Sequence, residues 1–148
     1  FYFYRYYNVL ISYYNYVMEE INMKKFYKCL HCGNVAEAVV NSGVPMICCG
    51  EPMHLLEPNT TDAAVEKHVP VVEIKGNVVF VKVGSVPHPM TPEHHISFIM
   101  LETNLGEQKK FIDNEEKAEA TFALSEGEKA IAAYEYCNLH GFWKAEIK

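Results

Sequence analysis

The sequence predicts an all-β protein in which a small metal-bound unit precedes an immunoglobulin-like antiparallel β-sandwich. Four cysteines are concentrated between residues 29 and 49, and the chain after residue 58 consists of short β-prone runs separated by turn residues. No long stretch has the helical periodicity of about 3.6 residues. Short strands with turns at this frequency are typical of an antiparallel sandwich.

The composition is that of a globular protein without the charge of a nucleic-acid binder. Hydrophobic residues make up 49% of the 148 residues and charged residues 22%, so a core is expected. Thirteen basic against nineteen acidic residues give a net charge of −6, which argues against DNA or RNA as partners. The five unevenly grouped cysteines do not suit a secreted disulfide framework and favour metal binding in a reducing, cytoplasmic compartment.

Residues 1–22 differ from the rest of the chain because tyrosine dominates them and polar residues interrupt them. They are too polar to be a good membrane span and lack the apolar middle of a signal peptide, so no membrane association is expected. Met23 opens a basic, well-patterned run. We therefore expect the natural protein to start at Met23 and residues 1–22 to be a non-native or disordered extension.

Residues 23–58 are the predicted small unit. A unit of roughly 35 residues is below the size at which a hydrophobic core alone usually suffices. Two residues separate Cys29 from Cys32, Cys48 and Cys49 are adjacent, and four thiolates imply one tetrahedral metal. Ligand type alone leaves zinc and iron equally open, and it also leaves open a purely structural zinc clip. Two disulfides are disfavoured in a reducing compartment.

Residues 59–148 are the predicted sandwich. Glycine-containing turns are expected at residues 75–77 and 125–128. The predicted strands cover Val69–Ile74, Val78–Val83, His95–Thr103, Ala120–Leu124, Ala130–Cys137 and Phe142–Ile147.

Five metal-binding side chains lie at the predicted strand ends or in loops of the sandwich. Any one of these histidines alone would more often be a surface or core residue. Cys137 and His140 have metal-ligand spacing, and two histidines six residues apart share a proline-containing loop, so convergence is expected. Five ligands exceed a closed zinc site and leave one octahedral position open, which suits a redox reaction at iron. The set is His68, His88, His94, Cys137 and His140.

Both constellations together resemble desulfoferrodoxin, the two-domain form of superoxide reductase, from Met23 to the C-terminus. The motifs that carry the resemblance are Cys29-Leu30-His31-Cys32-Gly33, Cys48-Cys49-Gly50-Glu51-Pro52-Met53, residues 59–64, Glu66-Lys67-His68-Val69-Pro70-Val71, His88-Pro89-Met90 and residues 134–141.

The resemblance implies two iron ions per chain. Residues 23–58 would be a desulforedoxin-like domain with one iron held by Cys29, Cys32, Cys48 and Cys49. Residues 59–148 would hold the catalytic iron, with Cys137 as its axial ligand and His68, His88, His94 and His140 in the equatorial plane. His95 sits where relatives often carry tyrosine, and the six-residue spacing from His88 favours His94 as the ligand.

The implied activity is one-electron reduction of superoxide to hydrogen peroxide at the open iron position. Lys67 would steer superoxide and hold a proton-delivering water, and Glu66 would occupy the vacant position in the ferric resting state. From residue type alone, both are more often solvated surface charges. The implied partners are rubredoxin or a similar small electron donor and a second copy of the chain in a homodimer.

Three other readings stay open at this point. The chain is a rubredoxin-like electron-transfer protein if its second metal site is structural, and a binding module if both metals are structural. A superoxide dismutase is the nearest enzymatic competitor, and it would evolve dioxygen as well as peroxide.

Overall fold

The computed structural model describes residues 9–13, which are helical, and residues 25–148. The chain divides into two compact units, Phe1–Leu56 and Glu57–Lys148. Most of the predicted N-terminal extension lies outside the described residues, so its nature stays a prediction. Among the described residues, no helix combines the length and apolar character needed to cross a membrane.

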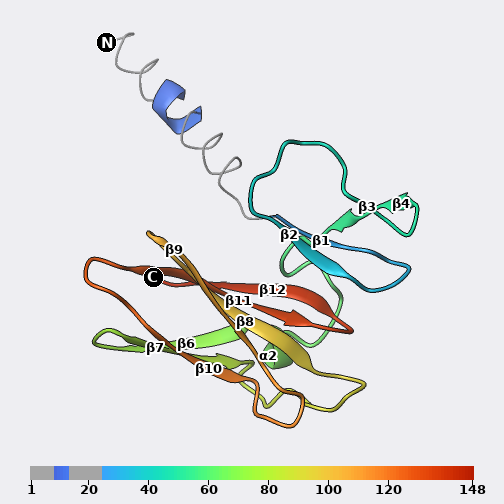
Figure 1. Ribbon diagram of the computed structural model, residues 1–148. Coiled ribbons are helices and arrows are strands. Elements are labelled where there is room, and N and C mark those ends of the chain that lie inside the picture. Colours follow the sequence, from blue (N-terminus) through green and yellow to red (C-terminus); the bar gives the residue numbers. More distant parts are fainter. Residues whose placement is uncertain (1–8, 14–24) are drawn as a thin grey trace. The chain divides into compact units, whose positions relative to one another are not determined.

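The first unit contains two small antiparallel sheets (Figure 1). The three-stranded sheet has the order β2-β1-β5, and β3 pairs with β4 in a hairpin. Among the described residues of this unit, Phe26 and Cys29 are the buried hydrophobic side chains, each 3% exposed. The strands are β1 (Lys25–Lys28), β2 (Val35–Ala38), β3 (Ile47–Cys48), β4 (Glu51–Pro52) and β5 (His54–Leu55).

The second unit is a sandwich of two antiparallel sheets that form facing layers (Figure 1). One sheet has the order β10-β7-β6 and the other β12-β11-β8-β9. The predicted all-β fold is confirmed. The strands are β6 (Pro70–Lys75), β7 (Val78–Val83), β8 (Ile96–Thr103), β9 (Gly106–Phe111), β10 (Glu119–Ala123), β11 (Ala130–Cys137) and β12 (Gly141–Glu146), and a short helix, α2 (Val65–His68), leads into β6.

The sandwich core is clearest in β7, where successive side chains alternate between the core and the surface. Val79, Val81 and Val83 of β7 are at most 1% exposed, whereas the residues between them face away from the core. Ile99 of β8 and Cys137 of β11 belong to the same core cluster. The thiol of Cys137, at the end of β11, therefore lies in the buried core of the sandwich.

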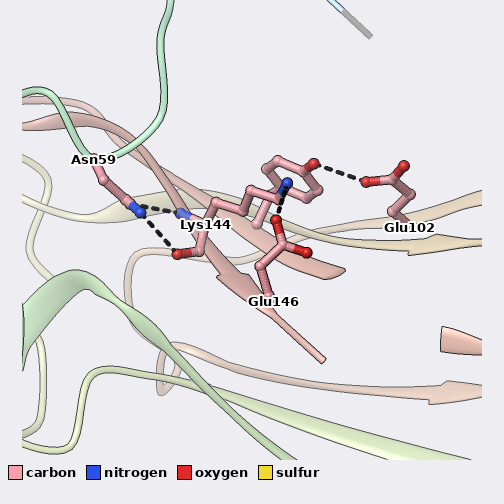
Figure 2. Close-up of polar contacts among 5 residues, drawn as sticks. Asn59, Glu102, Lys144 and Glu146 are labelled. Carbon is pink, nitrogen blue, oxygen red and sulfur yellow. Dashed lines mark hydrogen bonds and ion pairs between the residues drawn. The ribbon is translucent and has the colours of Figure 1, made fainter. Parts of the chain in front are cut away.

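Asn59 joins the beginning of the second unit to β12, the edge strand of the four-stranded sheet (Figure 2). Its backbone N–H donates to the Phe142 carbonyl at 3.0 Å, and its side chain brackets the Lys144 backbone at 2.8 Å and 3.1 Å. Tyr134 of β11 pairs with Lys144, and its hydroxyl donates to Glu102 at 2.7 Å. Burial, followed by this hydrogen bond, raises the pKa of Tyr134.

Candidate metal centres

The structure brings together all five candidate side chains of the sandwich. One nitrogen or sulfur atom from each lies within 4.8 Å of those of the others. His68 ends α2, two histidines lie in the loop between β7 and β8, Cys137 ends β11, and the last histidine lies in the turn before β12. The five residues are His68, His88, His94, Cys137 and His140.

The four imidazoles form a closed ring. Neighbouring ring centroids are 4.6 to 4.9 Å apart, and neighbouring rings meet edge to face at 74 to 87°. The order around the ring is His68, His88, His94, His140. Such a ring directs ring nitrogens towards one central point.

Two of the histidines have tautomers that are fixed by carbonyl groups. His68 Nδ1 lies 2.7 Å from the Ala64 carbonyl, and His88 Nδ1 lies 2.6 Å from the Pro89 carbonyl. A carbonyl can only accept, so Nδ1 carries the hydrogen in each ring and Nε2 presents a lone pair. These two Nε2 atoms are 3.2 Å apart, and His140 Nδ1 is 3.1 Å from His68 Nε2. The facing Nε2 lone pairs of His68 and His88 repel each other at this distance, and a shared cation would relieve that repulsion.

The surroundings of His68, His88 and His94 favour the neutral form of these three rings. Burial lowers the pKa of His68 and His94, and it lowers the pKa of His88 to about 4. Neutral imidazole is the form that binds metal ions. His94 Nε2 is buried and has no hydrogen-bond partner within the part of the chain that the structure describes. This orphaned nitrogen fits a metal ion at the centre of the ring.

Cys137, at the end of β11, supplies the one sulfur atom of the donor cluster. Its side chain is fully buried, and its Sγ lies 3.8 Å from His140 Nδ1. The backbone N–H of His140 donates to the same sulfur at 3.4 Å, which stabilises a thiolate. The tight turn from Cys137 to Gly141, where φ is 79°, brings both donors to one point.

The two adjacent histidines before β8 face different surroundings. His94 is the member of the donor cluster, whereas His95 Nδ1 lies 3.1 Å from the Thr91 carbonyl.

Lys67 and Glu66 precede His68 on α2, and both are exposed and outside the cluster of donor atoms. The Glu66 carbonyl accepts hydrogen bonds from Val86 N–H at 3.0 Å and from Ser85 Oγ at 3.3 Å. Gly84, with φ +74°, packs so closely that an added Cβ would lie 2.6 Å from the Glu66 carbonyl oxygen. The turn after β7 therefore holds the backbone of α2 in place.

The sequence analysis missed two buried residues around the cluster. Trp143 stacks on the His68 ring with centroids 4.9 Å apart, and its Nε1 donates to the His140 carbonyl at 3.1 Å. Glu135 is fully buried two residues before Cys137, and burial raises the pKa of its carboxyl group well above the ordinary value. Trp143 is the chain's one tryptophan and follows His140 closely, which is the signal that could have found it.

The four cysteines of the first unit also converge, with their sulfur atoms within 4.8 Å of one another. All the cysteines are free, and Cys32 Sγ lies 3.6 Å from Cys48 Sγ. The Cys32 backbone N–H points at Cys29 Sγ at 3.5 Å, because Gly33, with φ 81°, closes the turn.

The pKa values of Cys29, Cys48 and Cys49 are shifted from the ordinary thiol value, and not all in the same direction. The hydrogen bond from the Cys32 backbone lowers the pKa of Cys29 to about 6. Hydrogen bonding to the Cys32 thiol raises the pKa of Cys48, and it raises the pKa of Cys49 to about 12. Four crowded sulfurs thus resist losing all their protons together unless a cation binds them, which fits a tetrahedral thiolate metal site.

The fold and the two donor sets define a class of protein, a two-site metalloprotein with a thiolate unit and a β-sandwich centre of imidazole and thiolate. Family models agree: "Desulfoferrodoxin, N-terminal domain" matches residues 22–56 and "Desulfoferrodoxin" matches residues 60–146. The chain belongs to the desulfoferrodoxin family.

Individual relatives give the same result over most of the chain. The desulfoferrodoxin of Nitratidesulfovibrio vulgaris is 46% identical over 125 residues, which cover 84% of this chain and 98% of the relative. The desulfoferrodoxin of Syntrophotalea carbinolica is 46% identical over 120 residues, covering 81% of this chain and 94% of the relative. The crystal structure of the superoxide reductase from Treponema pallidum is 40% identical with a TM-score of 0.72, covering 84% of this chain and all of that chain.

Proposed function

We propose that this chain is a superoxide reductase that carries two iron ions. The observation that carries the proposal is the ring of four half-buried or buried imidazoles with the buried Cys137 thiol within 4.8 Å of their donor atoms. The likeness to the Treponema pallidum superoxide reductase supports it. The reaction joins one superoxide anion, one electron and two protons to give hydrogen peroxide, without release of dioxygen.

The two irons take the two donor sets. Cys29, Cys32, Cys48 and Cys49 hold one iron, and His68, His88, His94, His140 and Cys137 hold the other. Iron bound by these five residues would supply one-electron redox chemistry, which zinc cannot do. Five donors leave a sixth octahedral direction for a small anion.

The chain's own residues prepare the site for that anion. Neutral imidazoles and one thiolate leave a net positive charge when a divalent ion is bound, which attracts an anion although the whole chain carries −6. The Cys137 thiolate donates electron density to the ion, as thiolate ligands do in haem enzymes.

Lys67 and Glu66 act at the entrance of the sandwich site. The exposed Lys67 ammonium lies next to His68 and draws superoxide towards it, and it orders a water that delivers protons. Glu66 would supply a carboxylate to a ferric ion held by the cluster once the product has left.

The electron lost in each turnover returns from a small donor protein such as rubredoxin. Cys32 and Cys49 are exposed, so a donor can approach the thiolate site closely. The active form is a homodimer in the reducing cytoplasm of an anaerobe or microaerophile, where the activity removes superoxide.

Stopped-flow mixing of the reduced two-iron protein with superoxide tests the function. We expect one peroxide per superoxide, no oxygen evolution and rapid oxidation of the sandwich iron. Oxygen evolution at half the rate of superoxide loss would indicate a dismutase instead. Zinc in both sites of the native protein would also contradict the proposal.

A rubredoxin-like electron carrier with a structural second site is not favoured. Five donors surround one point in the sandwich, whereas a closed structural zinc site uses four.

A further inference from the structure

Asn138 lies between Cys137 and His140, and its side chain reaches the loop that carries a third member of the cluster. Its Oδ1 accepts a hydrogen bond from His95 N–H at 2.9 Å, and its Nδ2 donates to the Glu93 carbonyl at 2.9 Å. Its backbone N–H donates to the His95 carbonyl at 3.1 Å. The Glu93 carbonyl and the His95 N–H belong to the two peptide groups that flank His94. One side chain therefore fixes the backbone on both sides of His94.

His94 needs this support more than its neighbours do. Carbonyl groups orient the rings of His68 and His88 through Nδ1. The His94 ring has no such partner among the described residues, and its Nε2 is buried and unpaired. Its direction is therefore set by its backbone. The Thr91 hydroxyl accepts from His94 N–H at 3.1 Å and assists from within the same loop.

We propose that Asn138 is a positioning residue that holds His94 at the sandwich metal centre by bracketing its two peptide groups. The inference rests on the proposed function, because it takes His94 as an iron ligand. Asn138 follows Cys137 directly, so the same residue ties the sulfur ligand to an imidazole from a distant loop. Groups that orient metal ligands typically change metal affinity by about 10- to 100-fold when they are removed.

The chain contains a matched control for this geometry. Asn104 accepts from Lys129 N–H at 2.7 Å, donates from Nδ2 to the Gly127 carbonyl at 3.1 Å, and donates from its backbone to the Lys129 carbonyl at 3.1 Å. This is the pattern of Asn138, but it lies at the other end of β8 and outside the donor cluster. Asn59 brackets Lys144 in a related way (Figure 2). Asparagine side chains thus connect distant backbone segments at three places in this fold. Only Asn138 connects to a segment that carries a member of the donor cluster.

The test compares Asn138→Ala with Asn104→Ala in the full-length, iron-loaded protein. Both variants should lower the unfolding midpoint by similar amounts. The Asn138 variant alone should release the sandwich iron to excess chelator about 10- to 100-fold faster than wild type and alter the ferric EPR signal of that site. Wild-type release and an unchanged signal in the Asn138 variant, or the same changes in both variants, would overturn the assignment.

If Asn138→Ala does not fold, Asn138→Asp provides the same test. Aspartate keeps the acceptor for His95 N–H but turns an oxygen towards the Glu93 carbonyl, so iron release should again exceed the wild-type rate. Release at the wild-type rate would overturn the assignment. Two irons in wild type with equal release from both alanine variants would overturn only the role of Asn138. One iron per chain, bound in the four-cysteine unit alone, would overturn the proposed function and this inference with it.

Discussion

The ligands of the two metal centres differ in how far they are buried and in how many other contacts hold them in place. In the first unit two of the four cysteines are exposed, and the buried hydrophobic side chains among its described residues are Phe26 and Cys29. In the sandwich, by contrast, Cys137 is part of the core cluster itself. His68 stacks on a buried tryptophan, and two ring tautomers are fixed by carbonyls.

This difference indicates, for each unit, whether the metal ion organises the polypeptide or the folded polypeptide organises the metal site. A unit with so small a core depends on its metal, because the ion links segments that little else holds together. The sandwich has a much larger buried core, so we expect it to fold without metal and to present a preformed site. We therefore expect the first unit to need metal in order to fold, and the sandwich to position its metal ligands before any metal binds.

Removal of both metals is the most direct test and should have the largest effect. Structural metal binding to thiolate units contributes on the order of 10 kcal/mol, so the first unit should lose its structure while the sandwich remains folded. Hydrogen exchange would show it: the Cys29 amide, bonded to the Asn34 carbonyl at 2.8 Å, should lose protection. Amides of β8 and β11 should keep theirs. Equal loss of protection in both units would contradict the comparison.

Gly84→Ala tests whether the sandwich site is preformed by close backbone packing. The added Cβ would meet the Glu66 carbonyl oxygen at 2.6 Å, and φ is +74°. Strain of a left-handed residue and overpacking together should cost roughly 2–5 kcal/mol and displace α2. Thermal unfolding should show the loss, and the reaction with superoxide should slow because Lys67 and His68 move.

Gly76→Ala is the control for this change. Gly76 also has a positive φ, +60°, but nothing lies within 4 Å of an added Cβ. It should lose stability through backbone strain alone and keep the wild-type rate with superoxide. Equal rates in the two variants would indicate that α2 is not held by the turn after β7.

Lys67→Ala tests electrostatic access to the sandwich site. Burial is the largest cause that lowers the pKa of His68 and His94, and neighbouring histidines add to it. The charge of Lys67 lowers both pKa values further, so its electric field reaches the cluster. The second-order rate constant with superoxide should fall by about tenfold at low ionic strength and depend less on salt. Lys75→Ala removes the same charge from the far end of β6 and should leave the rate unchanged. Equal effects of the two substitutions would leave only net charge as the cause.

Much of the sandwich could be predicted from sequence because its inner strands are apolar, β-prone runs bounded by turn residues. Val78–Val83 and Ala130–Cys137 match β7 and β11 in both bounds. The strand β9, Gly106–Phe111, was missed because it is mostly polar and pairs with β8 at the edge of its sheet. The helix α2 was missed because one turn is too short to show periodicity.

The candidate donors could be identified because their chemistry is rare and their local spacing informative. Cys137 and His140 share one turn, which sequence reveals directly. The supports of the site could not be identified in this way. Asn138 reaches Glu93 across 45 positions, and Gly84 packs against α2 through backbone atoms that every residue has. Such roles depend on tertiary contacts rather than on residue type.

Glu128→Gln addresses the stability that the sandwich has without any metal, and its expected effect is the smallest. Hydrogen bonds from Ser125 N–H, then from the Thr103 and Ser125 hydroxyls, lower the pKa of Glu128 to about 2 from an ordinary value near 4.5. Because the folded-state pKa is the lower one, the carboxylate stabilises the fold above pH 4.5, and this contribution disappears as the pH falls towards 2.

The measurement is the difference in unfolding midpoint between metal-free wild type and the Glu128 variant as a function of pH. That difference should be constant from neutral pH to about 5 and should vanish between pH 4.5 and 2. Glu126→Gln removes the same charge from an exposed position in the same turn and should give no such pH-dependent difference. Subtracting the midpoint difference of the Glu126 variant from that of the Glu128 variant separates the effect of the hydrogen bonds to Glu128 from the loss of one negative charge. A pH-independent difference for Glu128 would mean that ionisation of its carboxyl group does not stabilise the turn. The metal-free stability of the sandwich would then come from its core without help from this carboxylate.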